Sequence, residues 1–316
     1  MNKLLLAAAL AFAPAAAFAQ SDAAATPAAA AARPAAELPD ANPAMWVVRD
    51  EDTVIYLFGT FHMLDGRPWF NDEVRAAFDA SDELVLEARL PDNPAELQPL
   101  LVRYAVDPQG RLLSQRLTAE QHAALGSALT AANVPAAAFD PLEPWFVAIS
   151  LPGIVGQQRL GIRAEHGPET VLSAAARERG IEIGELEGIE WQFRLFDGIP
   201  DELQLAMLGQ SLDNIDSIAD QLAPMLAAWS TGDVDSLIEM LNGNNRDNPD
   251  LHRLLFTQRN ATWAAWIAER MARPGTVFMA VGAGHLAGDD SVQAALEARG
   301  IGTERVAAEE TEETAS

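Results

Sequence analysis

VIYLFGTFH, which is residues Val54–His62, is the stretch of sequence that decides the fold. Its apolar, β-prone start predicts a buried strand, and this run breaks at a glycine that is followed three residues later by a histidine. The same plan recurs near the other end of the chain in TVFMAVGAGH, residues Thr276–His285. Two of the five histidines therefore follow apolar strands in Gly-x-x-His motifs. We expect these two histidines to meet in space and to hold a metal.

A strand–helix–strand unit is predicted directly after the first histidine. Asn71–Ser81 has a capping asparagine and apolar residues at helical spacing, and Leu84–Glu87 is a short apolar strand that ends in a carboxylate. Parallel strands joined by a helix are strongly favoured to form a right-handed crossover within one sheet. We therefore expect His62 and Glu87 to emerge at the same edge of that sheet.

The rest of the chain predicts the outline of the fold. Met45–Arg49 and the strand after it should form a hairpin, and residues 91–272 are mainly helical, with a brief strand at Ile181–Gly184. A helix at Ser291–Arg299 and a strand at Ile301–Arg305 close the chain. The predicted class is α/β (α+β), with a central mixed sheet formed from N- and C-terminal strand–helix–strand halves and a large helical insertion.

Both ends of the chain differ in composition from the middle. Residues 1–19 have the parts of a secretory signal peptide: Lys3, the apolar run Leu4–Phe12, and a small-x-small cleavage site that ends at Ala19. Residues 20–42 are rich in alanine and proline, which predicts a flexible linker, and the acidic residues 307–316 predict a disordered tail. The folded domain should then span residues 43–306. Since the chain has no cysteine, we expect export to a bacterial periplasm rather than a eukaryotic secretory route.

Composition limits the classes of partner. The chain has 316 residues and 49% hydrophobic residues, which allows one large globular domain or two small ones. Its formal net charge of −25 would repel nucleic acid. After the predicted signal, no stretch approaches the roughly 18–20 apolar residues that a membrane-spanning helix needs. A peptide or small-molecule partner remains, and the sequence does not predict an oligomeric state.

His62, Glu87 and His285 are the main candidates for chemistry. A histidine just after a strand is held by a stiff element at the edge where open α/β sheets bind ligands, and neutral imidazole is the commonest metal ligand. The alternative is that each histidine fills a turn or a core niche. Glu87 would be costly to bury unpaired, so it is either a solvated strand end or paired with a cation or metal.

Four further residues, Asp65, Asp289, Glu187 and Asn260, are secondary candidates, and Arg259 joins the catalytic candidates through a family resemblance. Asp65 and Asp289 follow the two histidines and could accept hydrogen bonds from their imidazole N–H groups, or be ordinary surface residues. Glu187 follows a short strand and a turn, and this position makes it a weaker candidate for the site. Arg259 and Asn260 lie on the long helix before the last apolar strand, where an arginine is commonly solvated or salt-bridged.

Several other chemistries are excluded by missing motifs. The sequence contains no Gly-x-Ser-x-Gly, no cysteine nucleophile, no His-Glu-x-x-His and no P-loop. A Gly-x-Gly-x-x-Gly after the first strand is also absent. The pair of Gly-x-x-His motifs therefore carries the functional prediction.

These motifs resemble the TraB/GumN family, whose relatives include the PrgY pheromone-shutdown proteins and the Tiki membrane metalloproteases. The family is marked by two Gly-x-x-His motifs and a glutamate, and the order of these features agrees here. The resemblance covers nearly all of the predicted domain. The matching segments are Tyr56–His62, the strand with Glu87, Gly184–Glu187 followed by Gln192, Arg259–Asn260, and Val281–Gly288.

The resemblance implies a function for these residues. Tiki proteins are described as proteases that depend on manganese or cobalt and need both histidines and the glutamate. By that likeness His62, Glu87 and His285 would bind Mn, Co or Zn and activate water for peptide hydrolysis, with Arg259 also in the site. Tiki proteins are tethered to membranes, whereas this chain has no predicted span. Two alternatives stay open: a non-catalytic protein that binds and sequesters a peptide or glycan, and a metal-dependent esterase-like hydrolase.

Overall fold

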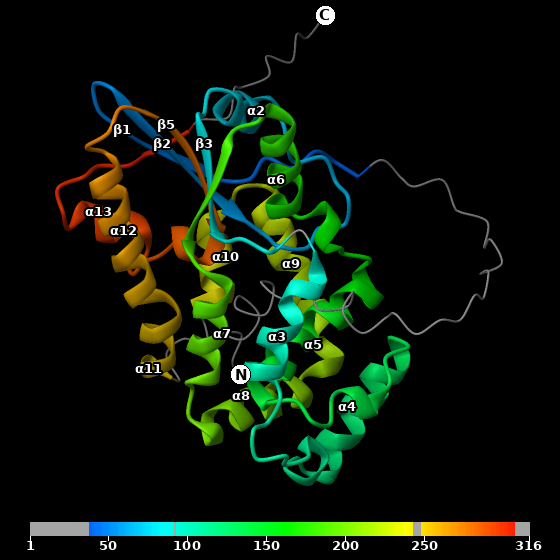
Figure 1. Ribbon diagram of the computed structural model, residues 1–316. Helices are drawn as coiled ribbons and strands as arrows, with labels where there is room; N and C mark the ends of the chain where they lie inside the picture. The colour runs from blue at the N-terminus through cyan, green and yellow to red at the C-terminus, as the bar shows by residue number, and fades with distance from the viewer. Residues whose placement is uncertain (1–37, 92, 243–247, 307–316) are drawn as a thin grey trace, which may run out of the picture.

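The computed structural model describes residues 38–91, 93–242 and 248–306. The predicted signal peptide, residues 20–37 of the predicted linker and the predicted acidic tail lie outside the described residues. A six-stranded sheet occupies one half of the molecule, and most helices of the insertion lie beyond one end of its strands (Figure 1). The predicted mixed α/β fold with a central sheet and a large helical insertion is confirmed.

The strands form one mixed sheet in the order β4-β3-β5-β2-β1-β6. The bounds of the strands are β1 Met45–Arg49, β2 Thr53–Thr60, β3 Glu83–Ala88, β4 Glu182–Glu187, β5 Gly275–Gly282 and β6 Glu304–Arg305. The four strands β4, β3, β5 and β2 run parallel, whereas β1 is antiparallel to both β2 and β6. The parallel strands therefore end at one edge, as the crossover rule predicts.

Two layers of helices cover the sheet. Helices α12 and α13 pack on one face against residues such as Val277 and Met279, and α2 and α6 pack on the other against Phe278 (Figure 1). Because both faces of β5 are covered, its sequence is a continuous apolar run rather than an alternating one. The helix bounds are α2 Asp72–Asp79, α3 Gln98–Leu100, α4 Ala119–Ala131, α5 Pro144–Leu160, α6 Pro168–Arg179, α7 Ile189–Asp197, α8 Asp201–Asp213, α9 Ile218–Ser230, α10 Val234–Asn242, α11 Pro249–His252, α12 Gln258–Arg270 and α13 Val292–Glu297.

Two strands differ from their predicted bounds. The brief strand expected at Ile181–Gly184 is longer, because β4 runs to Glu187 in parallel register with β3. The strand expected at Ile301–Arg305 is shorter, because the chain leaves α13 through a turn in which Gly300 has a φ of 78°. Pairing with β1 then starts only at Glu304.

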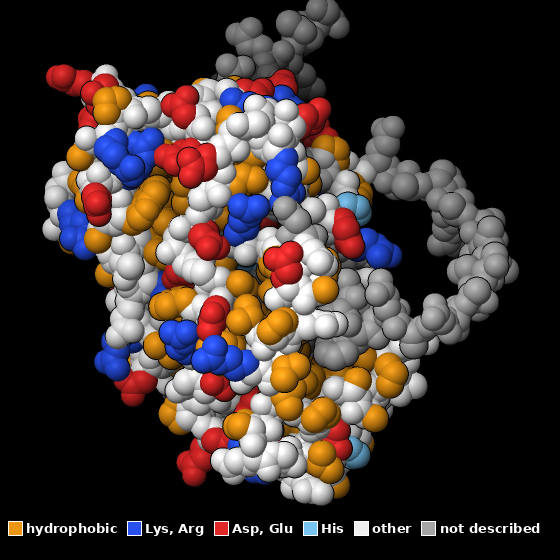
Figure 2. Space-filling model, in the orientation of Figure 1, with side chains coloured by type: hydrophobic (Ala, Val, Ile, Leu, Met, Phe, Trp, Pro, Cys, Tyr) orange, Lys and Arg blue, Asp and Glu red, His pale blue; other side chains and the backbone are white. Residues whose placement is uncertain are grey.

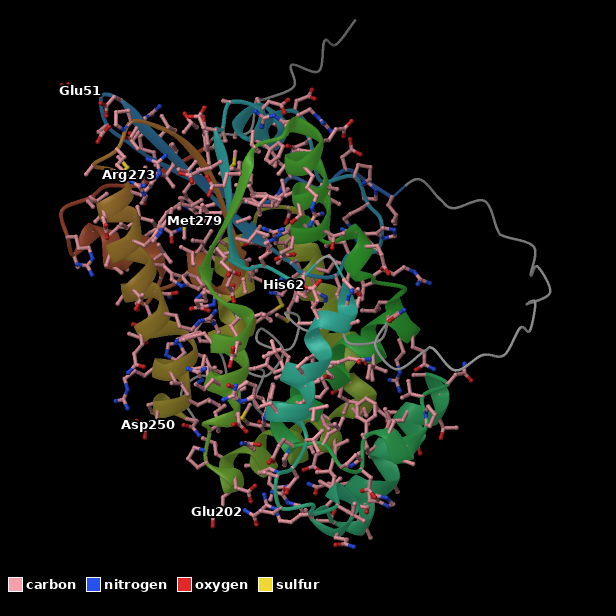
Figure 3. The ribbon with its side chains drawn as sticks, viewed as in Figure 1. Glu51, His62, Glu202, Asp250, Arg273 and Met279 are labelled. Carbon is pink, nitrogen blue, oxygen red and sulfur yellow. The ribbon has the colours of Figure 1, made fainter. Side chains whose placement is uncertain are left out.

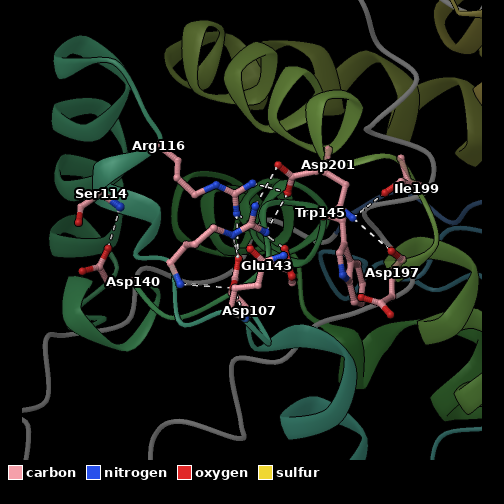
Figure 4. A network of polar contacts seen from close by, with 12 residues as sticks. Asp107, Ser114, Arg116, Asp140, Glu143, Trp145, Asp197, Ile199 and Asp201 are labelled. Carbon is pink, nitrogen blue, oxygen red and sulfur yellow. Dashed lines mark hydrogen bonds and ion pairs between the residues drawn. The ribbon is translucent and has the colours of Figure 1, made fainter.

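A charged network around the buried residues Asp107 and Glu143 links parts of the insertion (Figure 4). Asp107 accepts hydrogen bonds from Arg111 Nε at 2.7 Å and Arg116 Nη1 at 3.3 Å. Arg116 also pairs with Asp201 in the first turn of α8, and its Nη1 lies 3.8 Å from Glu143 at the start of α5. We call these five residues the Arg116 cluster; they join one loop to the starts of two helices.

The surface carries mixed charge. Figure 2 shows acidic, basic and apolar side chains interspersed over one face. Every basic side chain drawn in blue is an arginine, because Lys3 is the one lysine of the sequence. Arginine keeps its charge at all physiological pH values, so the ion pairs of this chain do not depend on lysine titration. In the described part of the chain, no helix is both long and apolar enough to cross a membrane.

Candidate functional site

His62, Glu87 and His285 converge at the edge where the parallel strands end. A Cβ atom placed on Gly282 would lie 3.4 Å from Glu87 Oε2, 3.6 Å from His285 Cδ2 and 3.7 Å from His62 Nε2. His285 Nε2 is 4.0 Å from Glu87 Oε2. Figure 3 shows His62 at the end of the sheet that faces the insertion, opposite Glu51 in the turn of the β1–β2 hairpin. The three residues that the sequence predicts to meet are therefore brought together.

The register of the two central strands sets this convergence. β2 and β5 pair in parallel along their whole length, and Thr60 lies opposite Gly282. Both Gly-x-x-His turns therefore begin side by side. Gly59 allows this close approach, since a Cβ there would lie 3.2 Å from the Cα of Ala283, which is tighter than side chains normally accept.

His62 is held from behind by Glu169, in the first turn of α6. His62 Nδ1 donates to Glu169 Oε1 at 2.5 Å, so Nε2 carries the lone pair when this imidazole is neutral. Gly167 makes this contact possible, because a Cβ at that position would lie 2.1 Å from the carbonyl oxygen of His62. Burial disfavours the charged imidazole, but the adjacent Glu169 carboxylate outweighs burial and raises the pKa of His62.

His285 is held by Asn260 on α12. Its Nδ1 donates to Asn260 Oδ1 at 2.6 Å, and its Nε2 accepts from Arg259 Nη1 at 3.2 Å. The ring lies between the aromatic rings of Phe256 and Trp263, whose centroids are 4.9 and 4.4 Å away. Burial and the positive charge of Arg259 lower the pKa of His285 to about 3, so this imidazole is neutral at physiological pH.

Arg259 joins the two buried glutamates of the site. Its Nη2 donates to Glu87 Oε1 at 2.5 Å and to Glu187 Oε2 at 2.8 Å, and its Nε donates to Glu187 Oε1 at 2.8 Å. Gln192 Nε2 donates to both carboxylates at 3.0 Å, and Trp263 Nε1 donates to Glu187 at 3.0 Å. We call Arg259, Glu87, Glu187 and Gln192 the Arg259 cluster.

The two glutamates of this cluster differ electrostatically. Burial alone would raise the pKa of Glu87, but Arg259 and the two imidazoles outweigh burial and lower it well below the usual range. The pKa of Glu187 is raised, because burial and the nearby charge of Glu87 outweigh the arginine. Glu87 is thus the fixed anion of the site. Glu187 is the last residue of β4 rather than part of a turn, and it anchors Arg259 from behind.

Asp65 and Asp289 do not contact the histidines in the way the sequence suggests. Asp65 Oδ2 accepts from Arg67 Nη2 at 2.6 Å, and Asp289 is exposed. Glu169 and Asn260 hold the imidazoles instead. Asn260 was a secondary candidate, whereas Glu169 was missed, because a glutamate in a helix first turn is ordinary in sequence.

Two pockets meet at the site. The inner pocket has a volume of ≈ 40 Å³ and is lined mostly by buried residues, which are Thr60, Phe61, His62, Glu87, Gln192, Leu195, Phe196, Met225, Leu237, Leu255, Phe256, Arg259 and Gly282–His285. The outer pocket has a volume of ≈ 240 Å³ and is lined by His62, Leu86–Ala88, Leu90, Pro91, Ala164, Glu169, Thr170, Ser173, Arg177, Ile189 and Gln192. His62, Glu87 and Gln192 border both.

The donor set has the chemistry of a divalent metal site. Two imidazoles that expose Nε2, each with Nδ1 bonded to an oxygen, and a carboxylate held by hydrogen bonds are typical ligands. As the described residues stand, no three His, Asp or Glu side chains form a ready metal site. In addition, Arg259 Nη1 donates to His285 Nε2, the atom that would bind a metal. A metal would require Arg259 to release His285 while it keeps both glutamates.

Proteins similar to this chain are known. The model of the TraB/PrgY/gumN family matches residues 44–305. A protein of Escherichia coli (strain K12) described as "Uncharacterized protein YbaP" is 27% identical over 252 residues, which cover 79% of this chain and 90% of the relative. The protein with that description from Shigella flexneri is 27% identical over 212 residues, covering 67% and 75%. No solved structure matches the chain.

Proposed function

The chain belongs to the TraB/PrgY/gumN family, and from the geometry at its sheet edge we propose that it is a metal-dependent hydrolase of the bacterial envelope that cleaves peptide bonds. The observation that carries this proposal is the matched support of the two histidines. Each imidazole donates its Nδ1 proton to an oxygen, and each Nε2 lies near Glu87 Oε2 at Gly282. Residues that only fill a core have no need of this paired orientation.

Each residue then has a defined task. His62, Glu87 and His285 would hold the metal, and the chemistry that a divalent metal supplies when bound is polarisation of the scissile carbonyl and acidification of water. Glu169 and Asn260 fix the imidazole tautomers. The backbone N–H of Gly282 donates to Glu87 Oε2 at 3.1 Å and fixes that carboxylate.

Arg259 supplies a permanent positive charge beside the reaction centre. It lines the inner pocket and is held by Glu87 and Glu187. A preorganised cation in a water-poor site stabilises the negative oxygen that develops when an amide carbonyl is attacked. Arg259 therefore acts both as the partner of Glu87 and as the stabiliser of the oxyanion.

A second candidate is a non-catalytic binding protein. It is favoured by the completeness of the Arg259 cluster, in which Arg259 already satisfies both carboxylates and His285. Such a protein would use the two pockets to sequester a peptide or glycan and would need no metal. An esterase-like hydrolase would share the metal chemistry and differ in substrate.

Metal content and turnover, measured together, separate these functions. The protein is loaded with Mn²⁺, Co²⁺ or Zn²⁺, dialysed, and analysed for metal, and it is then incubated with a peptide library and with simple esters. We expect about one metal per chain and peptide cleavage in the wild type, and loss of both in His62→Ala and His285→Ala. His122→Ala, which removes an exposed histidine of α4, is the matched control and should behave as wild type.

Each other result points to a different function. Equal metal content in the wild type and in both site variants would overturn the metalloenzyme proposal. Metal binding without cleavage of any peptide or ester would favour the binding protein. Cleavage of esters alone would identify the esterase-like activity.

A further inference from the structure

The reaction centre lies between two spaces of different character. His62, Glu87 and Gln192 form the border that the inner and outer pockets share. When a substrate bond lies beside these residues, the part of the substrate on one side of the bond therefore faces the inner pocket, and the part on the other side faces the outer pocket. The two spaces can select different parts of one substrate.

The inner pocket is small, buried and largely apolar. Beyond the polar residues of the site, its wall is built from Phe61, Phe196, Met225, Leu237, Leu255 and Phe256, all of them buried. Its volume is ≈ 40 Å³. A single water molecule needs roughly 10–15 Å³ of such space, so the inner pocket is several-fold smaller than the outer one and suits a small group.

The outer pocket is larger and open. Its volume is ≈ 240 Å³, and its rim includes the exposed residues Leu90, Thr170 and Arg177. A mixed polar and apolar rim suits an extended chain that continues into solvent. The outer pocket therefore has the properties of a site for the bulk of a substrate, and the inner pocket those of a site for one side chain.

We propose that the inner pocket is the subsite that selects the substrate, and that it takes one small apolar side chain, of the size of alanine or valine, from the residue next to the scissile bond. This inference rests on the proposed hydrolase function. The rest of the peptide lies in the outer pocket. Larger side chains exceed the space of the inner pocket. An acidic side chain would be repelled by the carboxylate of Glu87, which already forms an ion pair with Arg259.

Leu237 offers a way to change the size of this subsite. It lies on α10, is 4% exposed, and separates the inner pocket from a smaller neighbouring space of ≈ 10 Å³ that Trp46 and Trp229 line. Leu237→Ala should join the two spaces, whereas Leu237→Phe should fill the inner pocket. Met240→Ala changes a partly buried residue of the same helix that does not line the pocket, and it is the matched control.

The first test measures kcat/KM on peptides that differ only at the residue next to the scissile bond. The wild type should prefer alanine or valine over leucine and phenylalanine by at least about 10-fold, since one methylene in an apolar pocket discriminates by roughly 10–200-fold. Leu237→Ala should shift this ratio towards leucine and phenylalanine by about 10-fold. Leu237→Phe should retain only the glycine peptide, and Met240→Ala should keep the wild-type order. Equal cleavage of alanine and phenylalanine peptides by the wild type would overturn the proposal.

The second test does not depend on turnover. Propionamide, isobutyramide and phenylacetamide are titrated into protein labelled with ¹³C at the methionine methyl groups, and the signal of Met225 is followed with and without Zn²⁺. We expect the two small amides to shift this signal in the wild type, and phenylacetamide to shift it only in Leu237→Ala. Shifts from all three amides in the wild type, or from none, would overturn the proposal. Size-dependent shifts without any peptide cleavage would support the subsite while the hydrolase function fails.

Discussion

The Arg259 cluster and the Arg116 cluster are built alike but have different surroundings. In each, an arginine joins carboxylates that come from different elements of the fold, and at least one of those carboxylates is buried. The Arg259 cluster adjoins two histidines and borders both pockets, whereas no residue of the Arg116 cluster lines the inner or the outer pocket. Buried ion pairs therefore do not identify a functional site by themselves. Oriented imidazoles and adjoining space distinguish the site.

The physical roles of the two clusters should differ accordingly. Breaking a buried ion pair by removing one partner leaves an uncompensated charge, which costs roughly 3–5 kcal/mol whatever the function of the pair. Both clusters should thus contribute to the free energy of unfolding. Only the Arg259 cluster should also contribute to activity, so variants that separate the two effects test the comparison directly.

Arg259→Met should produce the largest effect, because it acts on both properties. It leaves Glu87 and Glu187 buried without their cation. We expect the free energy of unfolding in urea to fall by about 3–5 kcal/mol, and kcat/KM on a cleaved peptide to fall at least about 1000-fold. Arg259→Lys keeps the charge but not the forked geometry, and should recover part of the stability. If Arg259→Met were as stable and as active as the wild type, the Arg259 cluster would contribute to neither stability nor activity, and the contrast with the Arg116 cluster would fail.

Asp107→Ala should affect stability alone. Its side chain is fully buried and accepts from Arg111 and Arg116, so its loss removes the buried one of the two carboxylates that these arginines share. We expect the free energy of unfolding to fall by about 1–3 kcal/mol, because hydrogen-bond donors lose a buried acceptor while Asp201 still balances their charge. The kcat/KM of the protein that remains folded, measured at low temperature, should stay within about twofold of wild type, because the residue lies in neither pocket. A selective loss of turnover would show that the Arg116 cluster acts on the site.

Glu169→Gln should weaken the site while the fold remains intact. The amide oxygen of glutamine can still accept from His62 Nδ1, but the negative charge is lost. Outer partners of metal-binding histidines contribute roughly 10–100-fold to affinity or activity, and we expect a loss of that size in metal affinity. Glu165→Gln, at an exposed position nearby, is the control and should leave the affinity unchanged. Equal affinities in all three proteins would mean that Glu169 does not support the site.

Glu143→Gln should give the smallest effect and a pH-dependent one. Burial, with the nearby charge of Asp107, raises the pKa of Glu143 above its ordinary 4.5. The folded state therefore holds this proton more tightly than the unfolded state, and Glu143 contributes a loss of stability as pH rises from 4.5 through the raised pKa. Glutamine does not titrate. As pH rises from 4 to 7, the free energy of unfolding of the variant should therefore increase relative to that of the wild type, as measured by urea unfolding at each pH. A constant difference would contradict the raised pKa.

The convergence of the site could be predicted because it follows from strand order. Gly-x-x-His after each of two apolar strands, with Glu87 at the end of a third, required only that the strands be parallel. The pairing of β2, β5 and β3 meets that requirement. Sequence patterns near the strands therefore determined the positions of His62, Glu87 and His285.

The contacts behind the histidines could not be predicted in the same way. Glu169 reaches His62 because Gly167 lets α6 start against the His62 carbonyl, which depends on packing between segments about 100 residues apart. The short distance in sequence between Asp65 and His62 suggests a contact, but Asp65 instead accepts a hydrogen bond from Arg67, two residues later. The full length of β4 does not follow from the sequence either, because an edge strand that contains three glutamates lacks the apolar run that marks a buried strand.

The parallel pairing of β5 with β2 on one side and β3 on the other also sets how long the site persists. Amide protons that are bonded in the centre of a sheet exchange with solvent only when the largest cooperative unit of a protein opens. His62, Glu87 and His285 follow or end these three strands, so the strands cannot separate without opening that unit. In a hydrogen-exchange experiment the amides of β5 should be among the slowest to exchange. The lifetime of the assembled site is then the lifetime of the folded sheet itself.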